Sequence, residues 1–407
     1  MPMPMPMPIP IPIPIPSGFR FAGVSCGIKR DATKEDFSLI VCPRGAVAAG
    51  VYTQNLVFAA PVALDRERTP SADIRVVAVN SGNANACTGE RGLADAREMA
   101  RLAAEACGAA AEQALVMSTG IIGEFLPMQK IAAGAKAAAA KLADDEAAFL
   151  SAAHGIMTTD KFRKVAGRCV TIGGREIRLA GMAKGAGMIG PRMATMLSVI
   201  VTDAALTPAT AQAALAAAVE ESFNCISVEG HMSTNDTVLL LASGAAASGA
   251  LAGGELAEFE SALSQLCIEL ARMIPDDGEG ATHLVTIDVE GCATRPDARQ
   301  IAKTIAESAL VKTAICGGDP NWGRIVSAAG YAGVKFDPAK VDLIVNGSRL
   351  YRQGAPVKFD AAAVSAAMKG QRETSVVLRV GDGPAACRFW TSDLTHEYIR
   401  INADYHT

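Results

Sequence analysis

Aromatic residues, clustered basic residues and apolar membrane spans are all scarce in this chain of 407 residues. Phe, Trp and Tyr make up only 5% of it, and the formal net charge is −4. Its basic residues are scattered, so the basic footprint of a nucleic-acid-binding protein is missing. The best candidate for a membrane span, residues 238–251, is interrupted by serine and glycine. We therefore expect neither a nucleic-acid partner nor a membrane partner.

Metal-binding patterns of cysteine and histidine are missing as well. Ten cysteines occur between Cys26 and Cys387, but none forms a CxxC pair or stands near a histidine at zinc-ligand spacing. The five histidines are equally dispersed. Free thiols in a reducing compartment are the expected state. We expect a cytoplasmic protein that holds no metal and no bound cofactor.

The first sixteen residues alternate proline with methionine or isoleucine. Proline at every second position is incompatible with helix and with a central strand, so residues 1–16 are predicted to form an extended, disordered tail. The tail lacks the charged start and the helical apolar core of a signal peptide.

From residue 17 onward, short β-rich runs alternate with alanine-rich runs of helical periodicity. Strands are predicted at 37–42, 74–80, 115–118, 195–201, 285–289, 341–345 and 375–380. Helices are predicted at 93–111, 130–142, 207–223 and 360–369. This alternation is typical of α/β or α+β layering, in which helices lie outside sheets.

One glycine motif imitates a dinucleotide-binding fingerprint. Gly185-Ala-Gly-Met-Ile-Gly190 matches GxGxxG, and Asp203 lies eighteen residues after the first glycine. The fingerprint requires a helix directly after its last glycine. Here Pro191 follows, and residues 195–201 favour a strand, which leaves too few residues for a helix and its return. The motif does not indicate nicotinamide binding.

The same segment is suited to self-cleavage. A glycine-rich loop leads to the small Ala194, and a predicted strand begins at Thr195. The Thr195 hydroxyl could attack the Ala194 carbonyl, and hydrolysis would then free the Thr195 amine as a base for its own hydroxyl. On spacing alone, an ordinary strand threonine is the simpler interpretation.

Seven motifs in one order give a more specific indication. They are VNSGNANACTG (79–89), STGIIG (118–123), MTTD (157–160), AKGAGMIGPRMATML (183–197), STNDT (233–237), DGEG (277–280) and DPNWGR (319–324). From about residue 17 to the C-terminus, the chain resembles the ornithine acetyltransferase family, also called bifunctional glutamate N-acetyltransferase, of arginine biosynthesis.

The resemblance implies an N-terminal-nucleophile-like layered α/β sandwich with a smaller C-terminal α+β domain. Residues 17–275 would form the catalytic domain, and residues 276–407 would complete the substrate site. Cleavage between Ala194 and Thr195 would give an α-chain of residues 1–194 and a β-chain of residues 195–407, and the family commonly assembles as α2β2.

The resemblance also implies a ping-pong reaction. Thr195 would take acetyl from N-acetylornithine as an ester and pass it to glutamate. Thr119 and Gly120 match the oxyanion-hole pair of the family. Some members also use acetyl-CoA as donor, and no feature of this sequence decides whether this chain does.

The family's substrate residues carry over to matching positions of this chain. They are Thr158, Lys184, Thr195, Glu279, Asn402 and Thr407. A lysine suits the α-carboxylate that ornithine and glutamate share. Glu279 and the terminal carboxylate of Thr407 suit the δ-ammonium of ornithine. The choice between Thr158 and Thr159 as the contact stays open.

Other motif positions are expected to support the site or to depart from the family. Asn80, Asn83, Asn85 and Arg324 are expected to hold the site residues, although asparagines in such turns usually serve local hydrogen bonding. The departures put the choice of acetyl acceptor in doubt. They are Gly190, Arg192 and the stretch Glu229-Gly-His231-Met232 before Ser233.

Two other classes of function remain as alternatives. Self-cleaving aminopeptidases and amidohydrolases share this general fold and also use an N-terminal nucleophile. Lys184, Glu279 and the segment 319–324 favour the transferase over such a hydrolase. A metabolite-binding protein without activity is the third alternative, and an uncleaved chain that still binds ornithine would support it.

Overall fold

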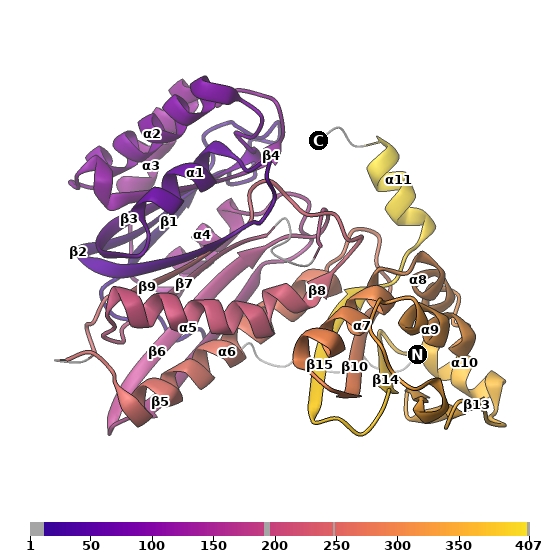
Figure 1. Ribbon diagram of the computed structural model, residues 1–407. Coiled ribbons are helices and arrows are strands. Elements are labelled where there is room, and N and C mark those ends of the chain that lie inside the picture. The colour runs from indigo at the N-terminus through magenta and orange to yellow at the C-terminus, as the bar shows by residue number, and fades with distance from the viewer. Residues whose placement is uncertain (1–11, 191–195, 247–248, 405–407) are drawn as a thin grey trace, which may run out of the picture.

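The computed structural model describes residues 12–190, 196–246 and 249–404, which form two sheets covered by helices (Figure 1). Within these ranges the first sheet has eight strands in the order β4-β3-β2-β9-β7-β6-β5, with β1 paired to β2. The strands are β1 (Arg20–Val24), β2 (Phe37–Tyr52), β3 (Ser71–Asn83), β4 (Ala114–Ile121), β5 (Lys164–Ile172), β6 (Arg175–Lys184), β7 (Leu197–Thr202) and β9 (Thr237–Ala242).

The long strand β2 belongs to both halves of this sheet. Its first half pairs with β1 and β3, and its second half, residues 47–52, pairs with β9. The register with β3 shifts between Val41 and Ala46, where Pro43 and Gly45 interrupt the strand. Proline cannot donate a ladder hydrogen bond, and Gly45 has a φ of +85°, so the strand can change direction there.

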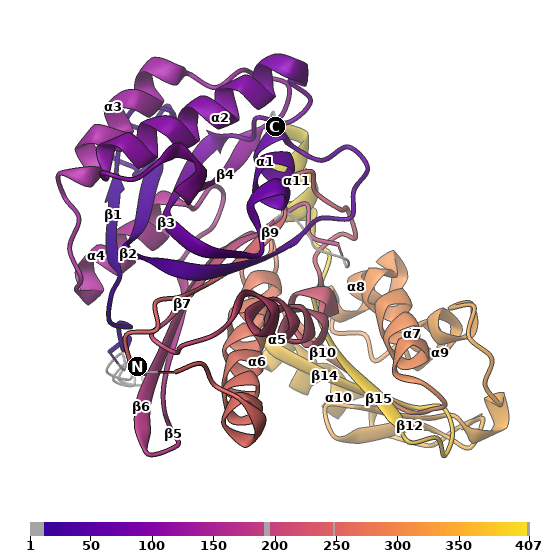
Figure 2. The same cartoon turned by 60° about the vertical axis from the view of Figure 1, so that its left-hand side comes forward.

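Helices cover both outer faces of the sheet and fill the space between its halves (Figures 1 and 2). The helices α1 (Ala60–Arg68), α2 (Gly89–Ala106) and α3 (Met128–Ala139) pack on the outer face of β1 to β4. The helix α4 (Glu146–Gly155) contributes to the core between the two halves. The helices α5 (Pro208–Glu221) and α6 (Gly253–Asp276) cover the other half. This is the layered α/β sandwich that was predicted.

A smaller second unit follows α6. Its sheet has the order β13-β12-β11-β14-β10-β15-β8. The strands are β8 (Ile226–Ser227), β10 (Leu284–Cys292), β11 (Asp342–Val345), β12 (Ser348–Arg352), β13 (Ala355–Pro356), β14 (Glu373–Arg379) and β15 (Ala385–Ser392). The helices are α7 (Arg295–Glu307), α8 (Ala309–Cys316), α9 (Trp322–Gly330), α10 (Ala361–Gly370) and α11 (His396–Asp404), and the 3-10 turns of the chain are 111–113, 223–225 and 338–340. The strand β8 precedes α6 in the chain, yet it pairs with β15 of this sheet.

The predicted elements coincide with observed ones where local signals are strong. Thr207 and Asp360 cap α5 and α10, and their side chains accept the N–H groups of Thr210 and Ala363. The predicted helix 93–111 ends at Ala106, because the chain turns through Gly108 at a φ of +67°. The β5–β6 hairpin and the 24-residue α6 were not predicted.

The end of the proline-rich tail corrects the prediction of disorder over residues 1–16. The N–H of Ile13 donates to Glu146 Oε1 at 2.9 Å. Ile13 and Ile15 also pack against the core between the two halves of the sheet. Burial of these apolar side chains orders residues 12–16 without helix or strand. The rest of the tail lies outside the described residues.

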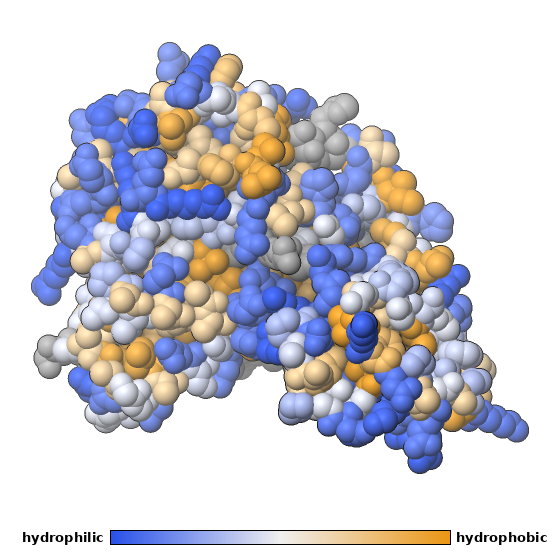
Figure 3. Space-filling model, in the orientation of Figure 1, coloured by the Kyte–Doolittle hydropathy of each residue, from blue (hydrophilic) through white to orange (hydrophobic). Residues whose placement is uncertain are grey.

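The surface in Figure 3 is a mosaic in which hydrophilic residues interrupt apolar ones. Exposed large apolar side chains include three consecutive residues, Leu56, Val57 and Phe58, and separate ones such as Leu310 and Ile399. Single exposed apolar residues are normal for a folded protein. None of the described helices combines the length and the apolar character that a bilayer crossing requires.

Candidate active site

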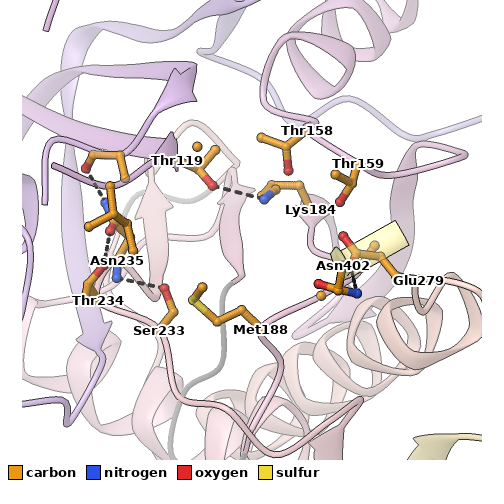
Figure 4. A pocket seen from close by; sticks show the side chains of 15 residues that line it. Thr119, Thr158, Thr159, Lys184, Met188, Ser233, Thr234, Asn235, Glu279 and Asn402 are labelled. Carbon is orange, nitrogen blue, oxygen red and sulfur yellow. Dashed lines mark hydrogen bonds between the residues drawn. The ribbon is translucent and has the colours of Figure 1, made fainter. Parts of the chain in front are cut away.

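A pocket collects the ends of several strands and loops from both units of the chain (Figure 4). It is lined by Ala84, Thr119, Gly120, Ile122, Thr158, Thr159, Lys184, Ala186, Gly187, Met188, Ser233, Thr234, Asn235, Glu279 and Asn402. Figure 4 shows Lys184 between Thr119 on one side and Glu279 with Asn402 on the other. Hydroxyls, a cation and a carboxylate therefore converge on one space.

The position of Thr119 follows from the way β4 is held. β4 is an edge strand, and α1 supplies partners to its free backbone groups. Asp65 Oδ1 accepts the N–H of Val116 at 2.9 Å, and Arg68 donates to the carbonyl of Ala114. Covering an edge in this way prevents pairing with another chain and fixes the end of the strand.

Gly120 is a position that no other residue can occupy. Its φ is +135°, and a Cβ there would lie 2.2 Å from the carbonyl carbon of Gly82 on β3. The backbones of β3 and β4 approach closely for that reason. Gly120 has no side chain that could cover the backbone beside Thr119, as an oxyanion site requires.

Lys184 points into the pocket from the end of β6 and is only 2% exposed. Its Nζ donates to Thr119 Oγ1 at 3.0 Å. Because an ammonium can only donate, the Thr119 hydroxyl accepts this bond and keeps its own proton free for another acceptor. Burial lowers the pKa of Lys184, and the nearby carboxylate of Asp160 opposes that shift.

Asp160 organises the floor of the pocket. Its Oδ2 accepts the N–H of Thr158 at 2.9 Å, and its Oδ1 accepts the N–H of Gly185 at 2.7 Å. Burial alone would raise the pKa of this carboxyl, but the charges of Lys164 and Lys184 outweigh burial and lower the pKa to about 2. Asp160 is therefore an anion at neutral pH.

Glu279 brings a carboxylate from the turn after α6. Its N–H donates to the carbonyl of Ala186 at 2.9 Å, which joins this turn to the glycine-rich loop. The side chain of Asn402 on α11 donates to Glu279 Oε2 at 3.0 Å. Gly187 leaves room for the carboxylate, since a Cβ there would lie 2.5 Å from Glu279 Oε2. The Glu279 side chain lines the pocket together with Asn402.

The segment Ser233–Asn235 lines the pocket, although no role was predicted for it. The side chain of Asn235 donates to the carbonyls of Ala84 at 2.6 Å and Ser118 at 2.8 Å, so it ties this segment to β3 and β4. The signal was present in the sequence, because STNDT was one of the seven motifs, but a motif does not say which of its residues face a ligand.

The next residue, Asp236, connects the pocket with the start of β7. It is fully buried, and its Oδ1 accepts the N–H of Met196 at 3.1 Å. Burial raises the pKa of Asp236 well above its ordinary value. Ala194 and Thr195, the predicted cleavage pair, lie outside the described residues, as does Thr407. Met196, which follows Thr195 in the chain, is 1% exposed.

Six predicted site residues meet in the pocket. They are Thr119, Gly120, Thr158, Lys184, Glu279 and Asn402. Thr159 lines it too, so both threonines remain candidates for the substrate contact. Asp203, the acidic residue of the imitation fingerprint, instead accepts the N–H groups of Arg178 and Ser17.

The supporting residues divide into two groups. Asn80 accepts the hydroxyl of Ser118 at 2.6 Å, next to Thr119 in the chain. Asn85 donates to the carbonyl of Gly92, which is the local role that such turns usually have, whereas Asn83 donates to the carbonyls of Glu124 and Phe125 in the segment after β4. Arg324 is not among the described residues that line the pocket, and its side chain donates to the carbonyl of Leu310 on α8. A sequence motif cannot reveal that its arginine faces another helix.

Two departures from the family pattern meet in space. A Cβ at Gly190 would lie 2.6 Å from the carbonyl carbon of Gly230, so the turn 229–232 occupies the place of a side chain. Glu229 Oε1 accepts the N–H of Ile189 at 2.5 Å, and His231 is exposed. Burial raises the pKa of Glu229 to about 8. Arg192 lies outside the described residues.

Comparison with known proteins identifies the family. The sequence model of the ArgJ family matches residues 20–407. The chain is 50% identical over 393 residues to the arginine biosynthesis bifunctional protein ArgJ of Rhodopirellula baltica, covering 96% of each chain. It is 46% identical over 394 residues to the protein of the same name from Symbiobacterium thermophilum, covering 96% of this chain and 97% of the other.

A solved structure agrees with these relatives. The crystal structure of arginine biosynthesis bifunctional protein ArgJ from Bacillus halodurans matches 52% of this chain and 100% of its own, with 39% identity and a TM-score of 0.51. The matches in sequence run through the motifs that build the pocket. The chain therefore belongs to the ArgJ family, and it is an acetyltransferase of arginine biosynthesis.

Proposed function

We propose that this chain moves acetyl from N2-acetylornithine to glutamate through an acetyl ester on Thr195. The chain first cuts itself between Ala194 and Thr195 and so forms an α-chain of residues 1–194 and a β-chain of residues 195–407. The observation that carries the proposal is the arrangement of Lys184 and Glu279, whose opposite charges face one pocket beside Thr119.

Self-cleavage converts a peptide bond into a free amine. The Thr195 hydroxyl attacks the Ala194 carbonyl, the acyl group moves from nitrogen to oxygen, and water hydrolyses the ester. The new α-amine has a pKa of about 8, so it can accept the proton of its own hydroxyl near neutral pH. The bond from Met196 to Asp236 supports this proposal because it anchors the chain directly after the nucleophile.

The transfer then takes two half-reactions. Thr195 Oγ attacks the acetyl carbonyl, and the tetrahedral oxyanion is stabilised by the Thr119 hydroxyl and the Gly120 N–H, at about 3 kcal/mol for each donor. Ornithine leaves with a proton, and the acetyl ester remains on Thr195. The amine of glutamate attacks that ester, and acetylglutamate leaves.

The pocket charges suit the two amino acids. Lys184 is the proposed partner of the α-carboxylate, which both substrates carry, and Thr158 lies beside it. Glu279, oriented by Asn402, is the proposed partner of the δ-ammonium that only ornithine carries. The terminal carboxylate of Thr407 is proposed to assist Glu279. No metal or bound cofactor has a role in these steps.

The test begins with a denaturing gel of freshly purified, active protein. Two polypeptides are expected, whereas Thr195→Ala should give one intact chain of 42.0 kDa and no activity. Thr313→Ala, on the exposed side of α8, is the matched control and should be cleaved and active. Incubation with N-acetylornithine alone should add the mass of one acetyl group to the β-chain. A single intact band from active protein would contradict self-cleavage.

The donor and the acceptor are tested separately. Acetylglutamate formation is measured with N-acetylornithine and with acetyl-CoA, and the second donor makes the enzyme bifunctional if it is used. Release of acetate in the presence of glutamate, without acetylglutamate, would assign the chain to the hydrolases instead. The proposed assembly is α2β2 in the cytoplasm, and light scattering of the cleaved protein measures the assembly.

A further inference from the structure

A lysine that no motif singled out lies beneath the pocket. Lys164 begins β5 and is fully buried, and its Nζ lies 2.6 Å from Asp160 Oδ1 and 2.6 Å from Asp277 Oδ2. All three side chains are completely shielded from solvent. A buried cation between two carboxylates is expensive to desolvate, so it contributes little to stability by itself and requires another explanation.

Each carboxylate that contacts Lys164 also holds a segment of the pocket. Asp160 accepts the N–H of Thr158, which lines the pocket, and the N–H of Gly185, which follows Lys184 in the chain. Asp277 accepts the N–H of Lys161 at 3.0 Å and stands two residues before Glu279. Lys164 thus joins the floor of the pocket to the turn that carries the Glu279 carboxylate.

The two carboxylates have different charge behaviour although they share one lysine. Lys164 and Lys184 together lower the pKa of Asp160 to about 2 despite its burial. Burial raises the pKa of Asp277 in spite of Lys164. The other titratable groups that face Asp160 or Lys184 are Lys29, Asp236 and Glu279. Neighbouring groups whose pKa values are driven apart commonly serve different roles in one site.

We propose that Lys164, Asp160 and Asp277 form a buried positioning unit in which Asp160 keeps Lys184 charged and Asp277 sets the place of Glu279. The inference rests on the proposed function of Lys184 and Glu279 toward the two ends of ornithine. Asp160 supplies the negative charge that keeps a proton on Lys184. Asp277, held by Lys164, fixes the turn of Glu279. Neither carboxylate contacts the substrate.

The role of Asp160 is tested by Asp160→Asn, which removes its charge and leaves Lys164 paired with Asp277. The measurement is kcat/KM of the cleaved full chain against pH, with N-acetylglutamate as the acetyl donor, because this donor has no group that titrates in the alkaline range. In this proposal kcat/KM falls at alkaline pH because Lys184 loses its proton, and this fall is the alkaline limb of the profile. We expect the variant to move this limb to lower pH by about one unit or more.

Lys184→Arg identifies the group behind the limb. Arginine does not lose its proton in this range, so the limb should disappear in whatever activity the variant retains. A limb that persists with arginine, or one that Asp160→Asn leaves in place, would overturn the electrostatic part of the proposal. The wild-type limb itself should lie below the ordinary lysine pKa, since burial of Lys184 lowers its pKa.

The role of Asp277 is tested by Asp277→Asn with two donors. We expect the KM of N-acetylornithine to rise about tenfold, because Glu279 loses its fixed place opposite the δ-ammonium. The KM of N-acetylglutamate, which has no ammonium, should change less than twofold, and kcat should fall little with either donor. An equal rise for both donors, or none for either, would overturn the positioning role.

Asp276→Asn is the matched control for both variants. Asp276 precedes Asp277, but its carboxylate pairs with Arg372 outside the pocket, so KM and the pH profile should stay as in the wild type. Thermal unfolding shows whether each variant is folded. Wild-type protein that fails to transfer acetyl from either donor would refute the proposed function, whereas active wild type with unaltered variants would refute only the positioning unit.

Discussion

Two buried lysines of this protein, Lys164 and Lys312, lie in opposite surroundings. Lys164 contacts two carboxylates beneath the pocket. Lys312, on α8 in the C-terminal unit, donates to the hydroxyl of Thr391 at 3.0 Å and to the carbonyl of Ser392. Among the described residues no carboxylate lies within ion-pair distance of Lys312. The same residue type thus has charged partners in one unit and neutral partners in the other.

The difference shows that partners, and not burial alone, decide how a buried lysine behaves. Burial lowers the pKa of Lys312 to about 8, because the carboxylates of Asp393, Glu229 and Glu307 act on it only from a distance. Lys312 can therefore give up its proton near physiological pH without breaking an ion pair. Lys164 belongs to a cluster that needs its charge, and this cluster lies at the pocket.

The comparison of the two buried lysines predicts the largest loss of stability for a substitution of Lys164. In Lys164→Met two carboxylates remain buried without their cation, so the free energy of unfolding should fall by about 3–5 kcal/mol. Urea unfolding of the full chain, followed by circular dichroism, measures the change. A loss below about 1 kcal/mol would mean that the cluster relaxes or admits water when the cation is removed.

A smaller loss is expected at Lys312. Lys312→Met leaves only neutral acceptors, Thr391 and Ser392, without a donor, so the free energy of unfolding should fall by about 1–3 kcal/mol. The same urea titration provides the value. A loss as large as that of Lys164→Met would remove the distinction between charged and neutral partners.

The dependence of stability on pH sharpens the comparison further. Glu229 has a folded pKa of about 8, above its ordinary 4.5, so stability should fall as pH rises from about 4.5 to 8. Lys312 has a folded pKa of about 8, below its ordinary 10.5, so stability should rise again from about 8 to 10.5. Each group can contribute at most about 1.4 kcal/mol per pH unit.

Differences between wild type and variants isolate these two contributions. Urea unfolding is repeated from pH 5 to 10 for Glu229→Gln and Lys312→Met. Relative to wild type, Glu229→Gln should lose the falling limb, and Lys312→Met should lose the rising one. Parallel curves for wild type and both variants would show that neither group changes its protonation on unfolding in these windows.

The smallest effect is expected at the surface. Arg101 on α2 has the same arrangement as Lys164, with Glu98 at 2.8 Å and Glu105 at 2.7 Å, but all three side chains are exposed. Water and salt screen such pairs, so the unfolding midpoint of Arg101→Ala should match that of wild type within error. A clear drop would show that the geometry of the cluster matters more than its burial.

The sequence predicted much of the candidate site because its motifs stand at the ends of strands. Thr119, Gly120 and Lys184 were named from motifs, and all three line the pocket. The threonine contact could not be reduced to one residue, since Thr158 and Thr159 both line it. The motif that contains Arg324 did not show that its side chain bonds to the backbone of α8, because a motif does not specify which surface its helix presents. Lys164 escaped notice because a lone lysine in a strand has no distinctive pattern.

The sequence alone determined the order of the elements, several helix starts and the family. Caps such as Thr207 and breaks such as Gly108 act within a few residues, so they can be recognised locally. The tertiary structure decided the fold of the sheet through β2 and the bridge from Lys164 to Asp277, which are 113 residues apart. Such contacts depend on how buried faces pack, and packing is a property of the whole chain.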